Sequence, residues 1–155
     1  MNLQTLGREA REAFRTLSRT GSEQREMAVQ AIATELHVQR AKVAEANLED
    51  IAAAIAEGLS KALIDRLTLS DARIDGLVAD VGALAGLPDP IGEVFDERVL
   101  SNGLRLSRRR VPLGVLGVIY ESRPNVTIDV AALAVKTGNA VILRGGKETI
   151  ESNRA

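Results

Sequence analysis

Residues 112–149 read PLGVLGVIYESRPNVTIDVAALAVKTGNAVILRGGKET, and this stretch decides the fold. Two short apolar runs within it, Leu113–Tyr120 and Asn139–Leu143, are rich in β-branched residues and are typical of buried strands. The segment between them, Val126–Lys136, has the pattern of a helix. Two strands joined by a helix form a βαβ unit, so this stretch predicts a parallel sheet and an α/β fold.

Each predicted strand runs into a polar loop. Glu121–Asn125 follows the first strand, and Arg144–Lys147 follows the second. In open α/β sheets, ligands bind at the carboxyl ends of the strands. We therefore expect these two loops to lie close to each other and close to a ligand.

The residues upstream of the βαβ unit predict several helices. Residues 1–87 are rich in alanine and carry apolar residues at helical spacing. Two prolines, Pro88 and Pro90, end this helical part because neither fits a helix interior. The apolar stripes of the second and third predicted helices are Ala28, Ile32 and Leu36, then Val43, Ala46, Leu48, Ile51 and Ile55.

A β-hairpin is predicted between the helical part and the βαβ unit. Asn102-Gly103 separates two β-like runs, 93–100 and 104–111, and this dipeptide is typical of a type I′ turn, in which both central residues have positive φ. The basic cluster Arg108–Arg110 lies on the second run. It is interpreted either as a phosphate-binding group or as a strand that faces solvent or another subunit.

Composition excludes several function classes. The 155 residues include 20 basic and 21 acidic side chains, and this balance does not indicate nucleic acid or an acidic membrane as a partner. No apolar run approaches the roughly 20 residues that span a bilayer, and no secretory signal is visible, so we expect a cytoplasmic location without membrane association. There is no cysteine, and the single histidine, His37, lies in a helical segment. These counts exclude disulfides and thiolate chemistry by this chain alone, and we expect no metal site.

Gly145-Gly146-Lys147 suggests a phosphate-binding loop, because glycines allow close backbone approach and lysine adds positive charge. It is not a P-loop, since that motif needs glycine and Ser/Thr at the positions that Val141 and Glu148 occupy. From the residues alone, a plain turn between strand and helix is an equal alternative.

Two contiguous segments carry a family resemblance: RRRVPLGVLGVIYESRPNVT (108–127) and KTGNAVILRGGKE (136–148). They resemble the gamma-glutamyl phosphate reductases (glutamate-5-semialdehyde dehydrogenases), which belong to the aldehyde dehydrogenase superfamily. Weaker similarity extends through 46–74. The resemblance covers nearly the whole chain but only the amino-terminal part of the family's sequence. Because the chain stops as a helix begins after the second strand, we interpret it as truncated.

The resemblance implies an aldehyde-dehydrogenase-like architecture with three parts. Residues 1–87 would be the helical beginning of the cofactor-binding domain, and 88–111 would be a hairpin arm used for oligomerisation. Residues 112–155 would start a Rossmann-like NADPH-binding domain, with the first βαβ unit of its parallel sheet.

The activity that the resemblance implies is the NADPH-dependent reduction of L-glutamyl 5-phosphate to L-glutamate 5-semialdehyde, with release of phosphate, in proline biosynthesis. The family's nucleophilic cysteine belongs to a later segment, so this chain alone is expected to be inactive. A homo-oligomer formed through 88–111 and association with glutamate 5-kinase are the expected assemblies. The alternatives are a non-catalytic assembly module and the reductase part of a bifunctional pyrroline-5-carboxylate synthase; the start at Met1, close before the first helix, argues against the latter.

The resemblance also assigns cofactor residues. Arg144 stands where aldehyde dehydrogenases place a lysine on the adenosine ribose, and Gly145 and Gly146 follow it. Lys147 replaces the acidic residue that is common in members preferring NAD. A cation suits the 2′-phosphate that distinguishes NADPH from NADH, so NADPH is the implied cofactor.

The loop after the first strand is expected to supply the substrate site. Asn125 resembles the asparagine that stabilises an oxyanion in the superfamily, and its alternative is a helix N-cap. The residue before it is not aromatic, as it usually is in the superfamily, but Pro124. Arg123 is interpreted as a ligand of the acyl phosphate or the glutamyl carboxylate, or as part of a structural salt bridge. Tyr120 and Glu121 are expected to line the cofactor cleft.

Overall fold

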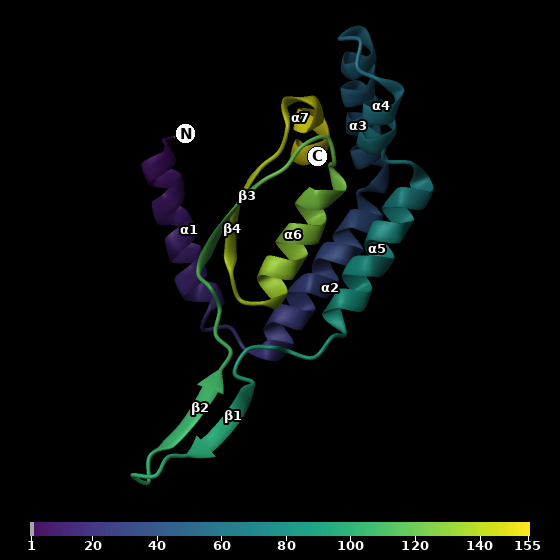
Figure 1. Cartoon of the computed structure of the whole chain (residues 1–155). Coiled ribbons are helices and arrows are strands. Elements are labelled where there is room, and N and C mark those ends of the chain that lie inside the picture. Colours follow the sequence, from purple (N-terminus) through teal and green to yellow (C-terminus); the bar gives the residue numbers. More distant parts are fainter. Residues whose placement is uncertain (1) are drawn as a thin grey trace.

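The computed structural model describes residues 2–155 and shows a helical layer, a projecting hairpin and a two-stranded parallel sheet (Figure 1). The predicted α/β class is confirmed. The elements are α1 (Leu3–Leu17), α2 (Ser22–Val38), α3 (Arg40–Ala56), α4 (Lys61–Leu67), α5 (Asp71–Ala85), β1 (Val94–Val99), β2 (Arg105–Arg109), β3 (Val115–Ile119), α6 (Asn125–Lys136), β4 (Ala140–Arg144), a 3-10 turn η1 (Lys147–Thr149) and α7 (Ile150–Arg154).

Strands β3 and β4 form the predicted βαβ unit with α6. They pair in parallel, with Val115 opposite Ala140 and Ile119 opposite Arg144. Gly138 follows the C-cap of α6 with a φ of 68°, which favours glycine, and the N–H of Asn139 donates to the carbonyl of Ala134 over 2.8 Å. This helix end turns the chain directly into β4.

The helices cover the sheet on both faces. Helix α1 lies against β3 and β4 on one face, and α6 lies on the other (Figure 1). Helices α2 and α5 pack on the outer side of α6, so the early helices and the βαβ unit share one core.

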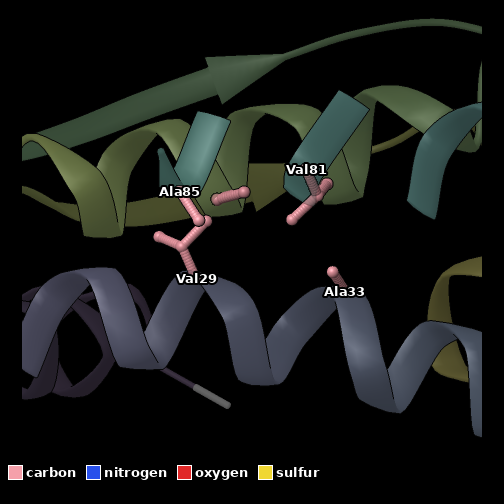
Figure 2. Packing of buried hydrophobic residues seen from close by; sticks show 5 residues of the cluster. Val29, Ala33, Val81 and Ala85 are labelled. Carbon is pink, nitrogen blue, oxygen red and sulfur yellow. The ribbon is translucent and has the colours of Figure 1, made fainter. Parts of the chain in front are cut away.

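Small side chains let α2, α5 and α6 approach closely. Val29 and Ala33 of α2 face Val81 and Ala85 of α5 in Figure 2, and Ala132 of α6 completes the cluster. All five are buried, and Val29 and Ala132 are fully so. Side chains of this size bury little area each, so stability here depends on close packing of the helix backbones.

The apolar stripe predicted for α3 is only partly correct, because Val43, Ala46 and Ile51 are partly buried but the fully buried face of this helix is largely polar. Leu48 and Ile55 are 65% and 60% exposed, whereas Asn47, Asp50 and Ala54 are buried. Ala28 of the predicted α2 stripe is also exposed, whereas Ile32 is partly buried and Leu36 is buried, beside Val29 and Ala33.

The buried polar side chains of α3 bind backbone that has no other partner. The amide of Asn47 donates to the carbonyl of Leu67 over 2.9 Å and accepts from the N–H of Leu69 over 2.7 Å. The carboxylate of Asp50 accepts from the N–H groups of Glu151 and Ser152 over 3.1 and 2.8 Å. Asn47 therefore fixes the turn after α4, and Asp50 fixes the start of α7.

The hairpin is present, but its turn differs from the predicted type I′. The N–H of Gly103 donates to the carbonyl of Leu100 over 2.9 Å, and Leu100 also pairs with Leu104. Gly103 has a φ of 86°, whereas Asn102 has no positive φ. The loop is therefore three residues long and ends in a left-handed glycine, an arrangement that tolerates Asn102 in an ordinary conformation.

No helix described within residues 2–155 is long and apolar enough to cross a membrane. Over the same range, no group of three or more His, Cys, Asp or Glu side chains is placed to hold a metal ion. His37 is exposed on α2.

Candidate functional site

The loops after β3 and β4 lie side by side, as expected. The N–H of Tyr120 donates to the carbonyl of Arg144 over 3.1 Å. Beyond the strands, Oε1 of Glu148 accepts from both the backbone N–H and the hydroxyl of Ser122, over 3.0 and 2.6 Å. These bonds, above all that from the Ser122 hydroxyl, lower the pKa of the Glu148 carboxyl, so the carboxylate is charged at neutral pH. Ser122 is buried with a φ of 40°, an uncommon conformation that this carboxylate stabilises.

A chain of hydrogen bonds joins the first loop to α6, α7 and the second loop. The hydroxyl of Tyr120 lies 2.5 Å from that of Thr127, which donates to Oδ1 of Asn153 over 2.7 Å. The amide of Asn153 donates to the hydroxyl of Thr149 over 2.8 Å, and Thr149 donates to the carbonyl of Gly146 over 3.0 Å. Because Thr127 uses its proton on Asn153, Tyr120 must donate its own to Thr127. The Tyr120 hydroxyl can therefore only accept from a ligand.

Gly145 is packed against this hydrogen-bonded chain. A Cβ at this position would collide with Nδ2 of Asn153 and would lie 3.1 Å from Oγ1 of Thr149 and 3.3 Å from the ring of Tyr120. Asn153 cannot easily move aside, since Thr127 and Thr149 hold both ends of its amide. The glycine is thus required by packing, whatever ligand the loop binds.

We expect Gly145→Ala to destabilise the chain by about 1–3 kcal/mol, the usual cost of an added methyl group in a tightly packed site. Urea unfolding followed by circular dichroism measures this loss. Gly117→Ala in β3 is the matched control, because a Cβ there meets no atom within 4 Å. Equal free energies of unfolding for the two variants would show that Asn153 and its hydrogen-bond partners move aside at little cost.

The two predicted cofactor cations are both exposed at the end of β4. Arg144 is the last residue of the strand. Lys147 begins η1, and its ammonium donates to Oε2 of Glu57 at the end of α3 over 2.8 Å. This hydrogen bond and the charge of Glu57 raise the pKa of Lys147. An exposed pair of this kind is weak and open to exchange, so the donor set fits an anionic group of a dinucleotide.

Arg123 and Asn125 line a cleft between α4, α5 and α6 with a volume of about 520 Å³. Asn125 is the first residue of α6, and its amide donates to Oδ2 of Asp129 over 3.1 Å. It makes no capping hydrogen bond, so the alternative reading of Asn125 as an N-cap is wrong. Since Nδ2 carries a second N–H, one donor is left for a ligand.

Arg123 makes no salt bridge within residues 2–155, and Glu121 is exposed at the start of the same loop. Ser122, Asp129 and Glu148 were not predicted from the sequence as site residues. Asp129 has a local signal, because it lies four residues after Asn125, which directly precedes the predicted helix 126–136. No pattern in the sequence indicates that Glu148 binds Ser122.

Similarity to known proteins is strong and covers the chain almost completely. A gamma-glutamyl phosphate reductase of Psychromonas ingrahamii is 57% identical over 153 residues, which are 99% of this chain and 37% of that protein. The crystal structure of the gamma-glutamyl phosphate reductase of Thermotoga maritima matches with a TM-score of 0.93 and 41% identity, over 99% of this chain and 37% of that one. No protein-family model matches the chain.

The fold is also similar to that of a more distantly related protein. An NAD-dependent benzaldehyde dehydrogenase of Corynebacterium glutamicum matches with a TM-score of 0.72 at 20% identity, over 93% of this chain and 29% of that one. The chain is therefore a homologue of the gamma-glutamyl phosphate reductases with an aldehyde-dehydrogenase-like fold, as its sequence suggested. It spans 37% of the length of the Psychromonas relative.

Proposed function

We propose that the protein containing this chain reduces L-glutamyl 5-phosphate to L-glutamate 5-semialdehyde with NADPH and releases phosphate. In this reaction the carbonyl carbon gains a hydride and loses the phosphate group. The observation that carries the proposal is the 57% identity to a gamma-glutamyl phosphate reductase over 99% of the chain. The joined loops after β3 and β4 support it, because they bring the candidate residues to one edge of the sheet.

NADPH would supply the hydride. Arg144 and Lys147 would bind the adenosine end of this cofactor, with Lys147 on the 2′-phosphate. Gly145 and Gly146 would let the backbone approach the ribose of the cofactor. Tyr120 and Glu121 would line the cleft that holds the cofactor. The exposure of both cations and the exchangeable partner of Lys147 support this assignment.

Asn125 would stabilise the oxyanion that develops on the substrate carbonyl. Asp129 fixes one N–H of its amide and thereby orients the other, and such pre-oriented donors act without reorganisation during the reaction. Arg123 would bind an anionic group of the substrate. The sequence has no cysteine, so the thiol nucleophile of the family would come from another part of the protein.

The β1–β2 hairpin is proposed to bind another copy of the protein. All residues of both strands are exposed, including Val99 at 66%. An isolated two-stranded ribbon is marginally stable in water, so partner packing would stabilise it. Association with glutamate 5-kinase is proposed as well, because an acyl phosphate is reactive and benefits from direct transfer.

A hybrid enzyme tests the proposed function. This chain would replace the corresponding part of the Psychromonas ingrahamii reductase, with the relative's own remaining segment following Ala155. We expect phosphate-dependent formation of NADPH from glutamate 5-semialdehyde and NADP⁺, at a rate comparable with that of the parent enzyme. A hybrid that folds, as judged by cooperative thermal unfolding, but lacks this activity would contradict the proposal.

A further inference from the structure

The cleft between α4, α5 and α6 carries more charge than the proposed role of Asn125 requires. Its volume of about 520 Å³ lies within the range of small-molecule sites. It opens beside Arg123 and Asn125, at the carboxyl end of β3. Six charged side chains line it: Asp65, Arg66, Arg73, Asp80, Arg123 and Asp129.

Most of these charges lack an opposite charge nearby. Arg73 pairs with Asp65 over 3.1 Å and also donates to the carbonyl of Thr68, so this pair fixes the turn between α4 and α5. Over residues 2–155, the other four form no salt bridge: Arg66, Asp80, Arg123 and Asp129. A cleft with unpaired charges of both signs is complementary to a ligand that carries both signs.

Asp80 and Asp129 form the acidic part of the cleft, and Asp129 is partly buried. Burial raises the pKa of the Asp129 carboxyl; the hydrogen bond from Asn125 opposes this, and the negative charge of Asp80 on the neighbouring helix adds to it. A cation bound between the two carboxylates would offset both the burial and the repulsion.

We propose that Asp80 and Asp129 bind the α-ammonium group of the substrate and that Arg66 and Arg123 bind its α-carboxylate, so that the cleft selects an amino acid. The proposal rests on the proposed function, which places the reacting carbonyl at Asn125. Asn125 and Asp129 lie one turn apart on α6, and their side chains meet, with Nδ2 of Asn125 3.1 Å from Oδ2 of Asp129. Four bonds separate the reacting carbon of a glutamyl group from its α-nitrogen, so one substrate molecule can contact both side chains.

The test compares two substrates in the hybrid enzyme: glutamate 5-semialdehyde and 5-oxopentanoate, which has the same chain and carboxylate but no amine. For Asp80→Asn we expect the ratio of the two kcat/KM values to fall about tenfold, the effect of losing one charge-assisted contact. Asp75→Asn is the matched control, since Asp75 is an exposed residue of the same helix that pairs with Arg40 outside the cleft. It should leave the ratio unchanged.

Two further variants distinguish the role proposed for Arg66 from the role proposed for Asp129. Arg66→Gln should lower kcat/KM for both substrates equally, because both carry the carboxylate. Asp129→Asn should lower the ratio, as Asp80→Asn does; an equal loss for both substrates would show that Asp129 only positions Asn125 and would overturn its assignment. An active hybrid whose ratio is unchanged by Asp80→Asn overturns the amino-acid selection and leaves the proposed function intact. A folded hybrid inactive on both substrates overturns the proposed function itself.

Discussion

Replacing Arg25 by methionine is expected to destabilise this chain by about 3–5 kcal/mol, the usual cost of removing one partner of a buried ion pair. The guanidinium of Arg25 binds the carboxylate of Asp89 and the carbonyl of Thr20, and the two charged side chains are only 5% and 19% exposed. Methionine keeps most of the length but leaves Asp89 without its cation. The melting temperature should fall by roughly 6–20 °C in thermal unfolding.

Arg40→Met is the matched control for this prediction. Arg40 pairs with Asp71 and Asp75 over 3.2 and 3.1 Å, but these pairs are exposed and should contribute about 0–1 kcal/mol. A loss in Arg25→Met no larger than in Arg40→Met would mean that the buried pair does not hold α2 to the segment before the hairpin.

Acid unfolding gives a second measurement of the same pair. Burial raises the pKa of the Asp89 carboxyl, but hydrogen bonds from Ile91 and Ser22 and the charge of Arg25 outweigh it, so the net shift is downward. A carboxyl with a lowered pKa contributes stability at neutral pH that is lost as the pH falls below about 4. We expect this acid loss to be smaller in Arg25→Met than in the unaltered chain.

The largest functional effect is expected for Lys147→Glu in the hybrid enzyme. If the ammonium binds the 2′-phosphate, the substituted carboxylate repels it, so the KM for NADPH should rise at least about tenfold. NADH lacks that phosphate, and its KM should change little. Steady-state kinetics with both cofactors measures the difference. Equal effects on both, or none on either, would show that Lys147 is not a cofactor residue.

Two variants control for charge and for the local ion pair. Arg19→Glu makes the same charge change in the turn between α1 and α2, far from the loop after β4 (Figure 1), and should not alter the selectivity. Glu57→Gln removes the partner of Lys147 but keeps the cation, so the KM for NADPH should not rise. A rise as large as that of Lys147→Glu would assign the effect to the pairing of η1 with α3.

The sequence was sufficient to predict the βαβ unit because its signals are local. Apolar β-branched runs, a helix between them and a glycine at the helix end all occur within about thirty residues of each other. Their parallel pairing follows from the crossover helix. The same local signals were sufficient to predict that the loops after β3 and β4 lie next to each other.

Helix α3 could not be predicted in the same way. Its apolar residues Leu48 and Ile55 indicate a buried stripe, but both are exposed in the structure. The face that is buried carries Asn47 and Asp50. Asn47 binds Leu67 and Leu69 across the turn after α4, and both side chains also bind α7, more than a hundred residues away. Polar burial depends on where backbone donors and acceptors meet in space, and periodicity along one helix does not contain that information.

Only part of the candidate site could be predicted, again because contacts between distant elements are not visible in a local pattern. Arg123 and Asn125 share the cleft, and Arg144 and Lys147 share the edge of β4. Their mutual positions depend on side-chain contacts between elements. The bond between Ser122 and Glu148, for example, exists only once both strands are paired.

The contacts of α3 also bear on how this protein forms during synthesis. Helix α7 has five residues, too few to be stable in isolation, and η1 before it has three. Asp50 of α3 binds the backbone at the start of α7, and Glu57, just after α3, binds Lys147 at the start of η1. Because α3 leaves the ribosome about a hundred residues earlier than α7, its polar face is available before β4 emerges. An element made earlier in synthesis can thus order the loop after β4 as that loop is made.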